Sequence, residues 1–171
     1  MVDRAALRRV QEPLKARYRE EPEAALVTLR ARGDLGAGIS CSVSTGRVLA
    51  EAGLHPASGG DGSLLCSGDM LLEALAACAG VTLRAVATSL EIPIEAGAVH
   101  VEGDLDFRGT LAVDRAASVG FREIRVRFDL DTEADDAQLD TLLRLTERYC
   151  VVYQTLVSSP PTSLSWRRAA A

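Results

Sequence analysis

One stretch limits the possible folds of this chain more than any other: the nearly uninterrupted apolar run from Asp69 to Leu90. Its length indicates a helix, and few polar residues interrupt it. A helix that is apolar on almost every side must be buried on almost every side. In one domain of 171 residues, this pattern predicts a central helix covered by a sheet, or by a sheet and a second subunit.

The residues on both sides of this run alternate with the two-residue period of β-strands. After the helix, the stretches from Val99 to Phe107 and from Ile124 to Leu130 alternate apolar with charged residues, and one charged face is mostly acidic and the other mostly basic. These two strands are therefore expected to pair antiparallel, with their charges on a solvated face. Before the helix, three short strands are expected at Leu26–Arg32, Ile39–Val43 and Arg47–Ala52, with glycine turns at Gly33–Gly38 and Gly46.

A second long helix is expected after the acidic stretch "DTEADDAQL", which suits a helix N-terminus. Its buried side is marked by residues from Leu139 through Cys150 to Val157. "SSPP" ends it, and Leu164 with Trp166 fits a last strand. The whole pattern predicts an α+β domain over residues 22–171, with an antiparallel sheet and two long helices on one side of it, preceded by a helical extension over residues 1–21.

Charge and composition argue against several classes of function. A net charge of −5 is unsuited to nucleic acid or to an anionic membrane. No signal-like segment opens the chain, and its longest uncharged apolar run, Ala74–Leu83, is too short to span a membrane. We therefore expect a cytoplasmic protein whose thiols are reduced. The cysteines match no zinc spacing and there are only two histidines, so neither a metal nor a bound cofactor is expected.

Two of the four cysteines, Cys78 and Cys150, lie at apolar positions of the two long helices and would meet if those helices pack together. They are open to two interpretations. Cysteine is often simply a small buried apolar residue. Alternatively, a thiolate could attack a peroxide to give a sulfenic acid, which the second thiol converts to a disulfide. Cys41, on a strand, and Cys66, in a loop before the central helix, are expected to be structural.

The stretch "SGDMLLEALAACAG", followed downstream by "ERYCVVYQTL", resembles the OsmC/Ohr family over residues 24–166. The resemblance implies an intertwined homodimer with active sites at the subunit interface. It also implies reduction of organic hydroperoxides by a cysteine pair, whose disulfide is reopened by an external dithiol such as a lipoyl group.

Carried over to this sequence, the resemblance makes Cys78 the peroxidatic cysteine and Cys150 the resolving one. Asp69 stands where the family has an acidic residue, usually glutamate, that holds an arginine beside the thiolate. The arginine would be Arg32, with Arg30 as the second choice. Nine residues of helix turn roughly 900° over about 13 Å, so Asp69 cannot reach Cys78 directly and would act through the arginine.

Cys150 is followed by Val151, where the peroxidases often carry proline. That difference points to the broader OsmC-like branch of the family and leaves two alternatives open. One is a non-catalytic OsmC-like dimer that binds a small apolar ligand at its interface, with both cysteines lining the pocket. The other is a different thiol reaction, such as sulfur transfer. The leading hypothesis is thiol-dependent reduction of organic hydroperoxides in oxidative-stress defence.

Several other residues have polar side chains near the expected site. Glu73 and Arg84 share a helix face and are expected to form structural polar contacts. Tyr149 and Tyr153 are expected to pack in the core near Cys150.

Overall fold

The computed structural model describes residues 3–6, 8, 9, 11, 12, 20, 32–35, 40–44, 49–112 and 114–168, and only the backbone at 32–35, 40–44 and 49. The elements are β1 (Arg32–Leu35), β2 (Ser40–Ser44), β3 (Leu49–Gly53), the 3-10 turn η2 (Pro56–Ser58), β4 (Leu65–Cys66), α2 (Ser67–Leu90), β5 (Ala96–Leu105), α3 (Phe107–Thr110), β6 (Phe121–Asp131), α4 (Asp136–Tyr149) and α5 (Val151–Val157).

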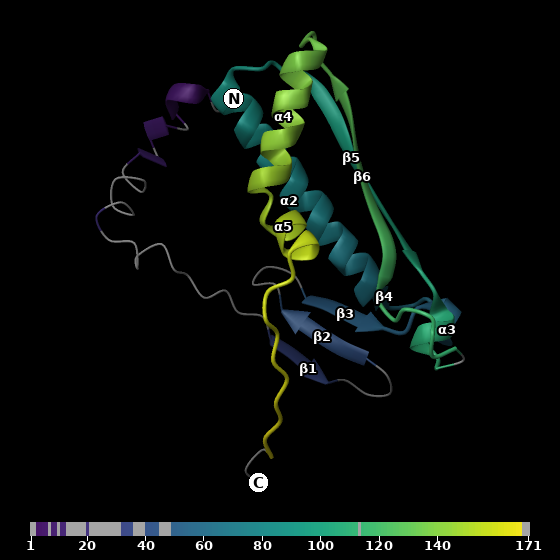
Figure 1. Cartoon of the computed structure of the whole chain (residues 1–171). Helices are drawn as coiled ribbons and strands as arrows, with labels where there is room; N and C mark the ends of the chain where they lie inside the picture. Colours follow the sequence, from purple (N-terminus) through teal and green to yellow (C-terminus); the bar gives the residue numbers. More distant parts are fainter. Residues whose placement is uncertain are drawn as a thin grey trace.

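The strands form two separate sheets, not the single antiparallel sheet expected from the sequence. One has the order β1-β2-β3-β4, and the other is the hairpin of β5 and β6. Strand β4, in which Cys66 lies, was expected to be a loop, but it pairs parallel to β3. Strand β1 begins at Arg32, which was expected in a strand, and continues through Gly33–Leu35, which were expected to form a turn; Gly33 instead pairs with Val43 of β2. Figure 1 shows the four-stranded sheet at the N-terminal end of α2.

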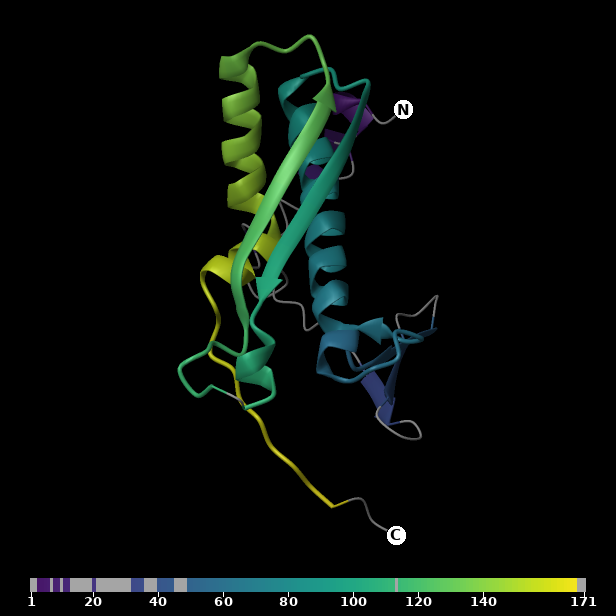
Figure 2. The same ribbon diagram turned by 90° about the vertical axis from the view of Figure 1, so that its right-hand side faces the viewer.

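The hairpin of β5 and β6 confirms the predicted antiparallel strands. Glu102 lies opposite Arg125, and His100 lies opposite Arg127. The Arg125 guanidinium forms a two-pronged ion pair with Asp104, with N–O distances of 2.5 and 3.0 Å. The outer face is therefore an exposed set of cross-strand ion pairs. The inner face lies against α2, and its residues Phe128 and Leu130 pack on the buried cluster that includes Leu142 of α4, the helix to the left of the hairpin in Figure 2.

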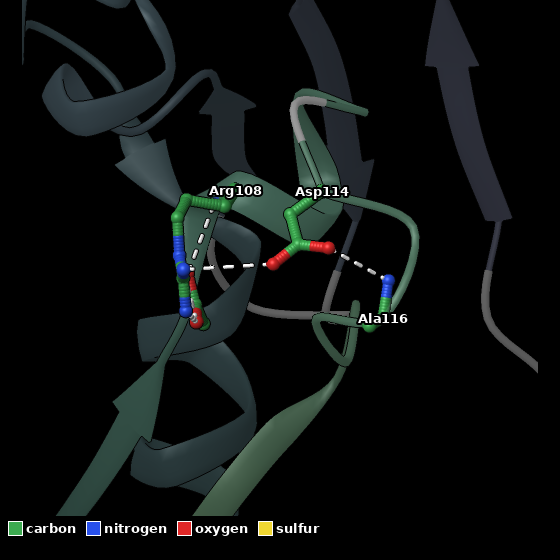
Figure 3. Close-up of polar contacts among 4 residues, drawn as sticks. Arg108, Asp114 and Ala116 are labelled. Atoms are coloured by element: carbon green, nitrogen blue, oxygen red, sulfur yellow. Dashed lines mark hydrogen bonds and ion pairs between the residues drawn. The ribbon is translucent and has the colours of Figure 1, made fainter.

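The connection between the hairpin strands differs from the sequence prediction at Phe107, which was placed in a strand but begins the short helix α3. The Asp106 carboxylate accepts from the Arg108 backbone N–H and so caps this helix. Arg108 also pairs with Asp106 at 2.6 Å and with Asp114 at 3.5 Å, while Asp114 accepts from the Ala116 N–H at 2.9 Å (Figure 3). Local capping ends the strand before Phe107 can extend it.

Helix α2 confirms the long apolar helix, but not its burial on every side. The residues it buries recur every four positions along one face: Leu75, Ala79, Leu83 and Ala87. Val81, on another face, is 72% exposed. By length and hydropathy α2 could cross a membrane, yet it packs against α4, α5 and β5 as the core helix of a globular protein does. Apolar side chains of α2 such as Leu71, Val81 and Leu90 are left exposed by the described part of the chain.

The second long helix of the sequence prediction is in fact two helices that meet at Cys150. Helix α4 begins with a capping box, in which the Asp135 side chain and the Gln138 side chain each accept from the other residue's N–H. It ends at Cys150, whose φ of −73° and ψ of 107° are extended, and α5 starts at the next residue. The prediction of one continuous helix was wrong because the apolar periodicity continues across the break.

Two buried clusters form the core along α2. The aliphatic cluster consists of Leu83, Ala87, Ile92 and Leu142. The cysteine cluster consists of Leu75, Ala79 and Cys150, with the half-buried Cys78 packed against it.

The two ends of the chain contribute little to this core. Residues 4–6, 8, 9, 11 and 12 are helical, and Arg4 pairs with Glu91 at the end of α2. At the other end, Leu164 and Trp166 lie on an extended tail with no strand partner among the described residues (Figure 1). The predicted last strand is therefore absent from the described part of this chain, where both side chains are exposed.

Candidate functional site

The fold brings the two predicted reactive cysteines together. Cys78 projects from the middle of α2, and Cys150 lies at the junction of α4 and α5, which packs on α2. Cys150 is only 1% exposed, whereas Cys78 is half-buried, and both are free thiols. The more accessible of the two sulfurs is therefore the one predicted to attack a peroxide.

The break at Cys150 exposes hydrogen-bond donors to Cys78. The Cys150 N–H closes α4 by donating to the Thr146 carbonyl, and the Cys150 carbonyl accepts from Gln154 in α5, both at 2.9 Å. The first N–H groups of α5 have no carbonyl partner within their own helix, and no side chain caps them. The N–H groups of Val151 and Val152 are among the causes that lower the pKa of the Cys78 thiol.

The pKa of the Cys78 thiol lies below its ordinary value. Burial alone would raise it, because burial disfavours the charged form. That effect is outweighed by hydrogen bonds from the Val152 N–H, the Cys150 thiol, the Val151 N–H and the Thr82 hydroxyl, in decreasing order. Each of these donors stabilises the thiolate. Among the described residues, the donors that lower the pKa of Cys78 are uncharged.

The pKa of the Cys150 thiol shifts the opposite way, above its ordinary value. Burial is the largest cause, and the neighbouring Cys78 adds to it because a second negative charge so close is unfavourable. Hydrogen bonds from the Tyr153 and Val152 N–H groups oppose the rise without reversing it. The pKa values of the two neighbouring thiols are therefore shifted in opposite directions.

The predicted arginine lies largely outside the described residues. Arg32 begins β1, but its side chain is among those not described, and Arg30 lies outside the described residues altogether. Asp69 is exposed in the first turn of α2, nine residues before Cys78. The pairing of Asp69 with either arginine stays a prediction.

A cleft of about 640 Å³ opens between α4 and β6. Its walls are mostly apolar, and Cys150 forms part of them. The Thr146 hydroxyl also lines it, is buried, and has no hydrogen-bond partner in the described part of the chain. At the rim, the Tyr153 hydroxyl lies 3.1 Å from the Glu147 carboxylate, and burial together with this carboxylate raises the pKa of Tyr153.

The remaining sequence candidates have structural roles. Arg84 was expected among buried polar groups, but it is exposed and donates to the Ile94 carbonyl at 2.6 Å, tying α2 to β5. Glu73 is exposed. Tyr149 was expected in the core but is 58% exposed, whereas Tyr153 packs against the cysteine cluster as expected. Within the described residues, no group of three metal-ligating side chains comes together.

Sequence reasoning missed the groups that surround the Cys78 sulfur, namely the amides of Val151 and Val152 and the Thr82 hydroxyl. A signal was available for the amides. The peroxidases that the chain resembles often carry proline after the resolving cysteine, and proline favours the first position of a helix. That position is Val151 here, the first residue of α5.

Comparison with known proteins places this chain in a family. A family model described as OsmC-like protein matches residues 60–165, more than half of the chain. No curated protein matches.

Three solved structures are similar to this one. An OsmC-like protein from Mycoplasma pneumoniae is 17% identical with a TM-score of 0.65, covering 78% of this chain and 89% of its own. An organic hydroperoxide resistance protein OsmC from Legionella pneumophila is 18% identical with a TM-score of 0.62, covering 78% and 92%. An organic hydroperoxide resistance protein from Elizabethkingia anophelis is 13% identical with a TM-score of 0.63, covering 79% and 91%. The chain belongs to the OsmC-like family.

Proposed function

We propose that this protein is a thiol-dependent peroxidase that reduces organic hydroperoxides in oxidative-stress defence. The observation that carries the proposal is the contact between Cys78, half-buried with a lowered pKa, and Cys150, buried with a raised pKa. A peroxidatic cysteine must be a thiolate when it meets its substrate, whereas a resolving cysteine reacts only after the sulfenic acid has formed. The names of the similar Legionella and Elizabethkingia proteins support the same activity.

The reaction would proceed in three balanced steps. The Cys78 thiolate attacks the terminal oxygen of the hydroperoxide, the O–O bond breaks, and the leaving alkoxide takes up a proton as an alcohol. Cys78 is then a sulfenic acid, with which the Cys150 thiol condenses, releasing water and forming a disulfide. An external dithiol, such as a dihydrolipoyl group, reduces this disulfide and is itself oxidised to a disulfide.

The surroundings of Cys78 favour apolar substrates. The side chains packed around the cysteine cluster from β5 and β6 are mostly aliphatic, with one phenylalanine: Val99, Val101, Ile124, Val126 and Phe128. An alkyl or lipid-like hydroperoxide gains by burying its chain beside such residues, whereas hydrogen peroxide has no chain to bury. We therefore expect alkyl hydroperoxides to be consumed faster than hydrogen peroxide.

A cation would add to the activation of Cys78. Arg32, or failing that Arg30, is proposed to approach the thiolate and the peroxide, with Asp69 holding the arginine in place. Replacing each arginine in turn with alanine tests the assignment. The correct arginine is the one whose loss slows peroxide consumption and raises the pH at which Cys78 reacts.

The active form is proposed to be a cytoplasmic homodimer with the cysteine pair near the interface. Two surfaces support a second copy. The outward side of α2 carries Val81, which is 72% exposed, although a helix so apolar should be covered. The tail presents Leu164 and Trp166, which are 102% and 83% exposed. A single species of monomer mass in sedimentation equilibrium would contradict the dimer.

The test of the activity is to incubate the reduced protein with cumene hydroperoxide and count free thiols on identified peptides. We expect Cys78 and Cys150 to be lost together as one disulfide, with one peroxide consumed for each. Cys66, which is half-buried and free, serves as the internal control. If neither Cys78 nor Cys150 is consumed, the peroxidase proposal is wrong.

A second candidate function is favoured by the cleft between α4 and β6. An apolar cleft of about 640 Å³ with one unpartnered buried hydroxyl, that of Thr146, suits a small apolar ligand with a single polar group. In that case Cys150 only lines the site. The apolar dye anilinonaphthalene sulfonate would then bind equally well to wild type and to Cys78→Ala, and less well to Leu143→Glu, which places a charge in the lining.

A further inference from the structure

We propose that Glu147 is a positioning residue for Cys150: two hydrogen bonds that it accepts from α5 hold that helix, and with it the buried Cys150, against Cys78. The Tyr153 hydroxyl donates to the Glu147 carboxylate at 3.1 Å. The Gln154 side-chain N–H donates to the Glu147 backbone carbonyl at 2.9 Å. Together these two bonds form the Glu147 clamp. The inference rests on the proposed function only in that Cys150 must react with Cys78.

The break at Cys150 creates the need for such a clamp. In a continuous helix the Glu147 carbonyl would accept from the N–H of Val151, four residues later. The torsions of Cys150 are extended, so α4 ends with a last backbone bond from the Cys150 N–H to the Thr146 carbonyl. The last carbonyl groups of a helix then need donors from outside its own ladder. The Gln154 side chain supplies that donor to Glu147.

Helix α5 depends on contacts with its neighbours. It is seven residues long, and a helix so short is not stable by itself in water. The Thr155 hydroxyl donates to the Val151 carbonyl, a bond that stays within α5. Among the described residues, the side-chain hydrogen bonds that join α5 to α4 are therefore the two of the Glu147 clamp. Burial and the Glu147 carboxylate raise the pKa of Tyr153, so its hydroxyl keeps the proton that it donates.

The position of α5 matters for the thiols because Cys150 immediately precedes this helix. Cys150 is 1% exposed, and Cys78 packs against the cluster that contains it. A second thiol that is held in contact reacts at a high effective concentration, and one on a loose segment does not. The Glu147 clamp should thus raise the effective concentration of Cys150 at Cys78 without touching either sulfur.

The test measures the equilibrium between the dithiol and the Cys78–Cys150 disulfide of the full-length protein in glutathione buffers. The Cys78 thiolate attacks glutathione disulfide and releases one glutathione. Cys150 then displaces the second, so two protein thiols are oxidised while one glutathione disulfide is reduced to two thiols. The disulfide fraction, read by mass spectrometry on the linked peptides, gives the effective concentration. The pH midpoint of Cys78 alkylation by iodoacetamide corrects each variant for a changed thiolate population.

Three variants each remove one bond of the clamp: Glu147→Ala, Tyr153→Phe and Gln154→Ala. Each should lower the effective concentration about fivefold, the effect of losing one hydrogen bond. Glu147→Gln removes the charge but keeps an acceptor for Tyr153, so it should stay near the wild-type value. Combining Glu147→Ala with Tyr153→Phe should lower the effective concentration no further than either alone, because both remove the same bond.

Thr155→Val is the matched control, because it removes a hydroxyl that bonds only within α5, and it should leave the effective concentration unchanged. The proposal is overturned if wild type forms no Cys78–Cys150 disulfide, if any of the three clamp variants matches wild type, or if Thr155→Val or Glu147→Gln lowers the value as far as Glu147→Ala. Circular dichroism checks the fold. Should Glu147→Ala not fold, Tyr153→Phe decides the test, since it removes the same bond.

Cumene hydroperoxide consumption by wild type, measured alongside, separates this inference from the proposed function. A wild-type protein that consumes no peroxide, while the clamp variants lower the effective concentration, would overturn the peroxidase and leave the role of Glu147 standing. A wild-type peroxidase whose effective concentration is the same in the clamp variants would overturn the role of Glu147 alone.

Discussion

The aliphatic cluster and the cysteine cluster lie along the same side of α2, and each includes one buried residue from the second half of the chain. Leu142, fully buried in α4, closes the first. Cys150, 1% exposed at the end of α4, closes the second. Leu142 sits inside a regular helix, whereas Cys150 sits where the backbone leaves the helix. The residue that α4 contributes to the aliphatic cluster is therefore purely hydrocarbon. The residue that it contributes to the cysteine cluster is a thiol, next to the first amides of α5.

This difference separates stability from reactivity along one helix. The aliphatic cluster has no group that can ionise, so it contributes through burial alone. The cysteine cluster buries fewer large side chains and places two thiols in contact, with pKa values shifted in opposite directions. Substitutions in the aliphatic cluster should thus change the free energy of unfolding, and substitutions in the cysteine cluster should change the reactivity of the thiols.

The largest expected effect is that of Cys78→Ser in the cysteine cluster. The serine hydroxyl holds almost no anion at neutral pH, so consumption of cumene hydroperoxide should fall roughly a hundredfold or more. Cys66→Ser, which changes a cysteine outside both clusters, should keep the wild-type rate. If the rate of cumene hydroperoxide consumption fell equally in Cys78→Ser and Cys66→Ser, the cysteine cluster would not be the reactive region.

Next in size is Leu142→Ala in the aliphatic cluster. Removing a fully buried leucine side chain should lower the free energy of unfolding by about 2–5 kcal/mol, measured by urea denaturation. The adjacent Leu143 is 40% exposed, and its alanine variant should lose about 1 kcal/mol or less. In Leu142→Ala that remains folded, the pH midpoint of Cys78 alkylation should not move. A shifted midpoint would show that the two clusters are not independent.

A smaller effect concerns the order in which the two thiols of the cysteine cluster react with iodoacetamide. Because the pKa of Cys78 is lowered and that of Cys150 is raised, Cys78 holds more thiolate at any pH below the ordinary thiol pKa. It should alkylate first there, by roughly tenfold for each unit of separation in pKa. Raising the pH should narrow the difference, and unfolding in urea should abolish it. Equal rates in the folded protein at neutral pH would contradict the assignment.

Periodicity predicted those parts of the fold in which many residues repeat one pattern. The alternation from Val99 onward predicted the hairpin, and the apolar run from Asp69 predicted α2. Features that depend on one or two residues were not predicted. The two residues of β4 are too few to show a period, and the extended torsions of Cys150 interrupt a helical pattern that continues on both sides.

The candidate site divides in the same way. Residue type and spacing indicated that Cys78 and Cys150 could meet, because both sit on apolar helix faces. The groups that shift their pKa values are mostly backbone amides, which every residue carries, so the side chains of Val151 and Val152 do not mark them as donors. The one indirect signal is the proline that the peroxidases often carry at the position of Val151, and the break at Cys150 in the structure identifies the amides directly.

The smallest expected effect comes from Val151→Pro, which tests that break directly. Val151 is the first residue of α5, and Cys150 before it has the extended backbone that a residue preceding proline prefers. Proline should therefore be tolerated, and it should stabilise the fold by about 0.4–1 kcal/mol through the unfolded chain.

Proline at position 151 also removes one of the N–H groups that lower the pKa of Cys78. The alkylation midpoint of Cys78 should consequently rise by a small amount, because the Val152 amide remains and lowers this pKa more than the Val151 amide does. Val151→Ala keeps the N–H and is the matched control, with an unchanged midpoint. A strongly destabilised proline variant would mean that α4 and α5 form one continuous helix in solution, and the distinction between the two clusters would then lose its structural cause.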